Sequence, residues 1–204
     1  MFVSLLFYYG MLTIGGTALD KLHLVVPNLN VWEQYYRFLF DQYQDTARID
    51  MMKLENAFTD AALKGIWQPL FQYLSDRYFE DSSVRDAIGG EKNVQGYFMA
   101  YLNLSRLFVI RPELEFKHGY CDFFLLADTK KFPVLQHSYV VELKYLKADA
   151  AENEAKTQWH EAEEQVRKYM SDESLKRMTA GTQLHGIILQ FQGGKLFNMG
   201  EVGV

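Results

Sequence analysis

The stretch that decides the fold is Tyr139-Val140-Val141-Glu142-Leu143-Lys144-Tyr145-Leu146. Almost every residue in it is apolar, which is typical of a central strand that is covered on both faces. The two exceptions, Glu142 and Lys144, stand two positions apart. Because successive side chains of a strand point to opposite faces, these two charges project from the same face. Residues 138–146 are therefore predicted to form a buried strand with a charged pair on one side.

A second apolar stretch, residues 120–127, carries one charge, Asp122. Burying a charge without a partner is costly, so Asp122, Glu142 and Lys144 predict a shared site on neighbouring strands. One interpretation is a structural ion pair of Lys144 with either carboxylate. The other is a site in which two carboxylates hold a hard divalent cation and the lysine orients a water molecule. The residues alone leave both interpretations open.

The surrounding pattern predicts an α/β domain with a mixed sheet flanked by helices. Glu91 begins the first helix of this domain, where it is either a further metal ligand or an acid stabilised by the helix dipole. The predicted elements, in chain order, are a helix at 91–106, strands at 108–116, 120–127 and 138–146, a helix at 150–170 and a strand at 182–191.

The N-terminal part is predicted to be a hairpin followed by helices. A short helix or strand at 3–9 precedes a hairpin at 11–26, with its turn beginning at Gly15-Gly16-Thr17. Three helices are expected at 31–43, 50–63 and 66–78, the last two separated by Gly65. The polar, glycine-bearing segment 80–90 marks the expected boundary. We thus expect an annex at 1–90 and an α/β domain at 91–204.

The composition narrows the class of protein. With 49% hydrophobic residues and 4 prolines among 204 residues, the chain is neither disordered nor collagen-like. Cys121 is the single cysteine, so no internal disulfide forms and a reducing compartment is expected, with the cytoplasm as the default. The apolar N-terminus lacks the basic region of a signal peptide. No stretch reaches the roughly 18–20 apolar residues that span a bilayer.

The net charge is −5, which argues against sequence-independent binding to nucleic acid. The acidity is uneven, however. Residues 1–90 hold 7 basic and 11 acidic side chains, whereas residues 91–204 hold 14 and 15. The α/β domain is therefore nearly neutral, and a phosphate substrate is compatible with it, although binding is expected to be weak without a metal.

The order of elements, with an aspartate on the second strand and Glu-x-Lys on the third, resembles the PD-(D/E)xK nuclease superfamily. The resemblance implies a restriction-endonuclease-like core and metal-dependent hydrolysis of phosphodiester bonds in DNA or RNA. It implies Asp122, Glu142 and Lys144 as catalytic residues, with Mg²⁺ or Mn²⁺ bound by Asp122, Glu142 and Glu91. Gln165 lies in the following helix, where many members place a supporting glutamine or lysine. The chain departs from many members at Cys121, where they have proline.

The resemblance is closer to a branch of bacterial (Bacteroidetes-type) proteins in which an AAA-ATPase-like region precedes the nuclease-like domain. Residues 6–14 and 26–30 are similar to the stretch that joins the two regions. The chain itself has no G-x-x-x-x-G-K-[ST] phosphate loop. An alternative to the nuclease is therefore a catalytically silent interaction or regulatory module of an AAA-ATPase-like protein.

Other polar residues near the predicted strands have simpler explanations. His118 and His137 are expected to be loop or strand-edge residues rather than metal ligands. Tyr169, four residues after Gln165 on the same helix face, is expected to pack or to hydrogen-bond near the site. Cys121 is expected to be a buried small residue and not a catalytic thiol.

Overall fold

A computed structural model of the chain describes residues 2–18, 21–25, 27, 31, 49–81, 90–116 and 119–203. The chain forms two compact units, Met1–Ile49 and Asp50–Val204. Residues 50–81, expected to be part of the annex at 1–90, lie in the second unit, which also contains the sheet. No helix in the described ranges is long and apolar enough to cross a membrane.

The first unit contains a short helix and a hairpin. Helix α1 spans Phe2–Tyr8, and strands β1 (Thr13–Ala18) and β2 (Lys21–Val25) pair antiparallel. The expected turn at Gly15–Thr17 was wrong, because these residues lie within β1. The pairing register shifts between Ile14 and Gly16, a local irregularity that a strand with glycines accommodates. Beyond Val31, the helix expected at 31–43 lies outside the described residues.

The second unit is built on a five-stranded sheet in the order β3-β4-β5-β6-β7. The β5–β6 pair is parallel and the other neighbours are antiparallel, so the sheet is mixed, as predicted. The strands are β3 Phe108–Phe116, β4 Gly119–Ala127, β5 His137–Leu146, β6 Gln183–Gln192 and β7 Lys195–Glu201.

Strand β7 was not predicted, although the sequence contains a signal for it. Gly193 and Gly194 have φ angles of 57° and 87° and form the two-residue connection between Gln192 and Lys195, which pair. Two consecutive glycines suit such a turn because both central residues need positive φ. The strand itself is largely exposed, so it lacks the apolar pattern that revealed the others.

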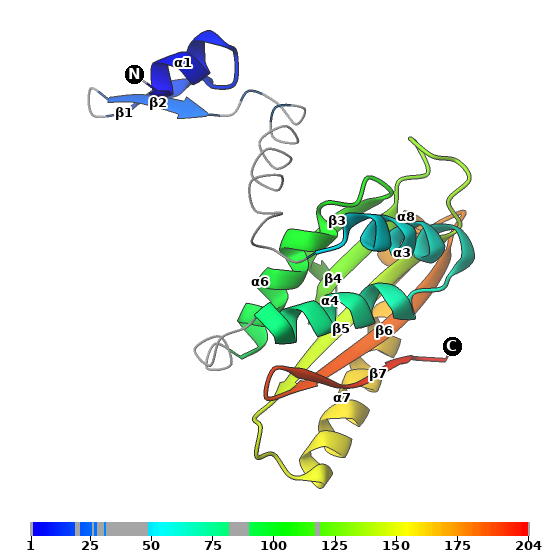
Figure 1. Cartoon of the computed structure of the whole chain (residues 1–204). Helices are drawn as coiled ribbons and strands as arrows, with labels where there is room; N and C mark the ends of the chain where they lie inside the picture. Colours follow the sequence, from blue (N-terminus) through cyan, green and yellow to red (C-terminus); the bar gives the residue numbers. More distant parts are fainter. Residues whose placement is uncertain are drawn as a thin grey trace. The chain divides into compact units, whose positions relative to one another are not determined.

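Helices cover both faces of the sheet (Figure 1). In that view α3 and α4 cross in front of the strands and α7 lies behind them. The helices are α3 Met51–Lys64, α4 Gln68–Asp81, α6 Glu91–Leu102, α7 Glu152–Ser171 and α8 Glu173–Met178. On the α6 side, the ring of Phe98 stacks on Phe123 at 6.1 Å between centroids. On the α7 side, Val166 and Tyr169 pack in one buried cluster with Phe124.

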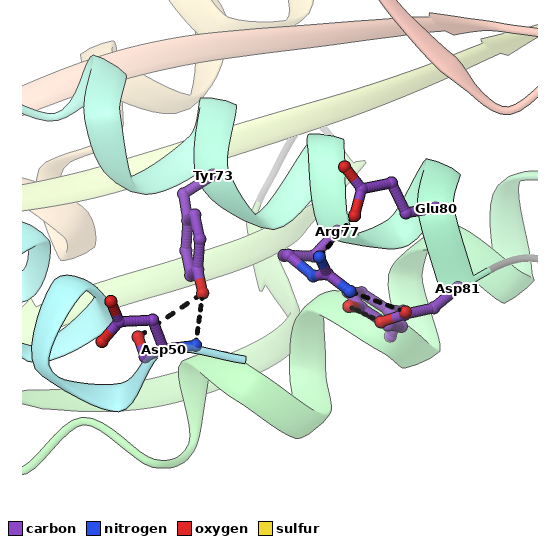
Figure 2. A network of polar contacts seen from close by, with 6 residues as sticks. Asp50, Tyr73, Arg77, Glu80 and Asp81 are labelled. Carbon is purple, nitrogen blue, oxygen red and sulfur yellow. Dashed lines mark hydrogen bonds and ion pairs between the residues drawn. The ribbon is translucent and has the colours of Figure 1, made fainter. Parts of the chain in front are cut away.

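Polar contacts hold α4 to its neighbours (Figure 2). Asp50 caps α3 by accepting a hydrogen bond from the Lys53 amide, and its own amide donates to the Tyr73 hydroxyl at 2.7 Å. Further along α4, Arg77 pairs with Glu80 and, at 2.9 Å, with Asp81. The Asp50–Tyr73 contact joins the start of α3 to α4, whereas the Arg77 pairs lie within α4 and brace its last turns.

Candidate active site

The backbone pairing between β4 and β5 ends at Phe123, the residue next to Asp122. It joins Leu125 to Tyr139, Phe124 to Val140 and Phe123 to Val141. At the next position, Oδ2 of Asp122 accepts a hydrogen bond of 2.7 Å from the Leu143 amide. A side-chain carboxylate thus replaces a backbone carbonyl as partner of β5, which anchors Asp122 beside Glu142.

Glu142 and Lys144 form an ion pair on one face of β5. Glu142 is 4% exposed, and its Oε1 lies 2.8 Å from Nζ of Lys144. The structural ion pair that the sequence left open is therefore present. This ion pair involves only Oε1 of the Glu142 carboxylate and not Oε2.

The charge of Glu142 adds to the cost of ionising Asp122. Burial, and then the charge of Glu142, raise the pKa of Asp122 to about 7, against the hydrogen bond from Leu143. Burial likewise raises the pKa of Glu142, although the Lys144 ammonium opposes this. Two close carboxylates in a dry site bind a proton or a cation more readily than isolated ones do.

Two buried oxygens, Oε2 of Glu142 in this site and Oε1 of Gln165 on α7, four residues before Tyr169, make no hydrogen bond within the described residues. The Tyr169 hydroxyl lies close enough to lower the pKa of Glu142, but it donates its hydrogen bond to the Tyr120 carbonyl at 2.8 Å. A buried acceptor without a donor costs about 1–3 kcal/mol. Carboxylate and amide oxygens are the ligands that Mg²⁺ and similar hard cations prefer, so this donor set fits a divalent cation.

Glu91 is exposed at the start of α6, and its charge contributes to the raised pKa of both Asp122 and Glu142. It therefore lies within electrostatic range of the pair. Among the described residues, however, no group of three or more His, Cys, Asp or Glu side chains is arranged to hold a metal ion. The structure brings two carboxylates together and leaves Glu91 as a neighbour.

Sequence reasoning missed Gln95. Its Nε2 lies 3.4 Å from Oδ1 of Asp122 and holds the oxygen that Leu143 does not use. The signal for it was its position four residues after Glu91, which puts both side chains on the same face of α6.

The remaining candidates have the roles expected of structural residues. Cys121 is fully buried, and burial raises the pKa of its thiol to about 12, which keeps it protonated and unreactive. His118 lies outside the described residues. His137 hydrogen-bonds His185 and takes no part in the carboxylate site.

A mixed five-stranded sheet with helices on both faces, carrying Asp122 and Glu142-x-Lys144 on adjacent strands, defines a restriction-endonuclease-like α/β protein. The model of the PD-(D/E)XK nuclease superfamily matches residues 89–201, more than half of the chain. The chain belongs to this superfamily, and the matched segment contains every residue of the site described above. No curated protein and no solved structure matches the chain.

Proposed function

We propose that the chain is a metal-dependent nuclease that hydrolyses phosphodiester bonds of DNA or RNA. One observation carries the proposal. The buried carboxylate of Glu142 and the half-buried one of Asp122 meet beside a lysine, and buried oxygens of Glu142 and Gln165 have no hydrogen-bond partner within the described residues. Purely structural ion pairs have no reason to leave such oxygens unpaired. Membership of a nuclease superfamily that is generally dependent on divalent metals agrees with this reading.

In the proposed site, Asp122 and Glu142 hold Mg²⁺ or Mn²⁺, and Glu91 assists as a further carboxylate. Gln165 supports the site through its buried amide oxygen. Such a cation, when bound, neutralises charge on a phosphate and lowers the pKa of a coordinated water. The chain's own contribution is to fix the two carboxylates: Asp122 through Leu143 and Gln95, and Glu142 through Lys144.

In this proposal, Lys144 orients the attacking water. Its side chain is 19% exposed, so Nζ lies at the rim of the site, while its partner Glu142 is more deeply buried. Its ammonium would hold a water molecule at this rim and stabilise negative charge that develops on the phosphate oxygens.

The test is cleavage of single- and double-stranded DNA and RNA with Mg²⁺ or Mn²⁺, compared with the same reaction in EDTA. We expect metal-dependent cleavage by the wild type and its loss in Lys144→Ala and Asp122→Ala. Lys176→Ala is the matched control, because Lys176 is exposed on α8 and pairs with Glu173 at 2.9 Å, as Lys144 does with Glu142. Equal cleavage by wild type and both site variants would refute the assignment.

The proposal extends to an AAA-ATPase-like region in the full-length protein and to the Bacteroidetes-type branch. This rests on the resemblance of residues 6–14 and 26–30. In the N-terminal unit, α1 exposes the large apolar side chains of Val3, Leu5 and Phe7, which gives such a region a surface to pack against. If the nuclease-like domain were only a silent module of that protein, neither Mg²⁺ nor Mn²⁺ would bind or support cleavage.

A cytoplasmic location belongs to the same proposal and is supported by a single, buried cysteine.

A further inference from the structure

A chain of three hydrogen-bonded side chains crosses the sheet away from the carboxylate site. His137 stands at the start of β5, His185 on β6 and Glu201 at the end of β7. Nδ1 of His137 lies 2.9 Å from Nε2 of His185, and Nδ1 of His185 lies 2.6 Å from Oε1 of Glu201. His185 is 5% exposed. The proposed nuclease chemistry uses none of these residues.

The hydrogen-bond partners define a consistent arrangement of protons for neutral rings. Since the Glu201 carboxylate only accepts, Nδ1–H of His185 donates to it, and Nε2 of a neutral His185 accepts from Nδ1–H of His137. Nε2 of His137 is left with a free lone pair. The two nitrogens of His185 point to different partners, so the three side chains form a line and do not converge on a common ion. The arrangement is a hydrogen-bonded line rather than a chelate, and we call the three side chains the relay.

The relay ties three strands to the connection between α3 and α4. The other oxygen of Glu201 accepts a hydrogen bond of 3.0 Å from the indole N–H of Trp67, which is buried just before α4. The His185 ring stacks on Tyr139 at 4.9 Å, and the Tyr139 hydroxyl donates to the Ala61 carbonyl of α3 at 2.7 Å.

The His137 ring packs on Gly65, the left-handed residue that ends α3. A Cβ at Gly65 would lie 2.9 Å from Cε1 of this ring. Both ends of the relay therefore touch the segment that joins α3 to α4, through His137 at one end and Glu201 at the other.

We propose that His137, His185 and Glu201 form a pH-sensitive latch that closes β7 and the α3–α4 connection onto the sheet and opens in acid. One proton enters at Nε2 of His137 without loss of a hydrogen bond, because Nδ1–H still donates to His185. A second proton, on Nε2 of His185, makes this nitrogen a donor that faces Nδ1–H of His137 at 2.9 Å. Two donors cannot hydrogen-bond each other, so the contact between the two histidines is lost.

The charged and titratable groups around the relay set the direction of this effect. Strand β7 brings Glu201, β5 brings the Tyr139 hydroxyl, α3 brings Lys64 in its last turn, paired with Asp60 at 2.7 Å, and α4 brings the uncharged Trp67. Burial, and next the neighbouring His185, lower the pKa of His137, and Glu201 opposes them. A lowered pKa in the folded state means that the folded chain binds fewer protons than the unfolded chain. Stability is therefore lost as the pH falls below the ordinary histidine value of about 6.5.

The test is NMR of the full chain without metal or nucleic acid between pH 8 and pH 4, so its outcome is independent of the proposed nuclease activity. The readouts are the Trp67 indole N–H signal, assigned with Trp67→Phe, and the hydrogen exchange of β7 and β4 amides. We expect the indole signal and the protection of β7 to be lost together in acid while β4 stays protected. The latch would be overturned if the amides of β7 and β4 lost their protection at the same pH midpoint, or if the β7 amides stayed protected down to pH 4.

His137→Gln sharpens the test, because a glutamine oxygen accepts from a doubly protonated His185. We expect this variant to move the opening of β7 to lower pH by about one unit, a tenfold change in proton concentration. His160→Gln, at the exposed His160 of α7, is the matched control and should leave the midpoint unchanged. An unchanged midpoint in His137→Gln would also overturn the proposal.

Discussion

The two ends of strand β5 carry polar clusters of opposite character. At its start, both nitrogens of His185 and both oxygens of Glu201 have hydrogen-bond partners. Towards its end, Glu142 is buried with one oxygen that has none within the described residues. Both clusters are set in the same sheet, so the difference does not come from burial. It comes from the partners that neighbouring elements supply: one cluster is closed by hydrogen bonds, and the other keeps the oxygen that the proposed function assigns to a cation.

The largest expected effect that separates the two clusters comes from removing the Lys144 side chain. Lys144→Ala should lower metal-dependent cleavage by about 100-fold or more, because groups that stabilise transition-state charge contribute on that scale. The measurement is the single-turnover rate on a labelled oligonucleotide at saturating Mn²⁺. Trp67→Phe, which changes only the anchor of the relay, should cut at the wild-type rate. If it lost activity as Lys144→Ala did, the two clusters would not be functionally distinct.

Divalent metal should stabilise one cluster and leave the other untouched. At a concentration 100 times its Kd, Mg²⁺ or Mn²⁺ should raise the free energy of unfolding by about 2.7 kcal/mol, because only the folded chain presents the paired carboxylates. Urea unfolding with and without EDTA measures this. The gain should disappear in Asp122→Asn and persist in Trp67→Phe. An equal gain in Asp122→Asn would place the metal elsewhere.

Asp122→Asn should stabilise the metal-free protein at pH 8. Because the pKa of Asp122 is raised from 3.8 to about 7, the wild type is most stable below pH 3.8 with respect to this group and loses that stability as the pH rises to about 7. Removing the charge should restore about 2 kcal/mol, discounted from the full shift for partial solvation. Urea unfolding at pH 5 and pH 8 tests the sign. Glu164→Gln, at an exposed carboxylate of α7, is the control and should have little effect.

Trp67→Phe should have the smallest effect, a loss of about 1 kcal/mol, since one hydrogen bond to Glu201 is removed and the partly exposed carboxylate is rehydrated. Trp159→Phe is the matched variant, because the Trp159 indole also donates to a glutamate, Glu163, within one helix turn. It should cost less than Trp67→Phe in urea unfolding. The reverse order would show that the relay's anchor to α4 does not stabilise the sheet.

Much of the sheet could be predicted because most of its strands carry an apolar pattern within their own sequence. The predicted strand at 108–116 has the bounds of β3, and those predicted at 120–127, 138–146 and 182–191 differ by one residue at one or both ends from β4, β5 and β6. Their apolar runs are long enough to reveal a strand without knowledge of its neighbours. Strand β7 and helix α8 were missed because the first is mostly exposed and the second is short.

The site was predicted in part for a similar reason. Glu142 and Lys144 belong to one face through strand alternation alone, whereas the approach of Asp122 depends on where the β4–β5 pairing stops. The contact with Gln95 and the line from His137 to Glu201 join residues that are 27 and 64 positions apart. No local pattern signals such contacts.

The sequence by itself determined the α/β class, the order of the core elements and the three charged residues at their centre, because apolar periodicity and the cost of a buried charge are local properties. The tertiary structure decided that α3 and α4 pack with the sheet, that Asp122 bonds the Leu143 amide, and that His185 lies between His137 and Glu201. These outcomes depend on which distant groups meet, and therefore on how the strands and helices pack against one another.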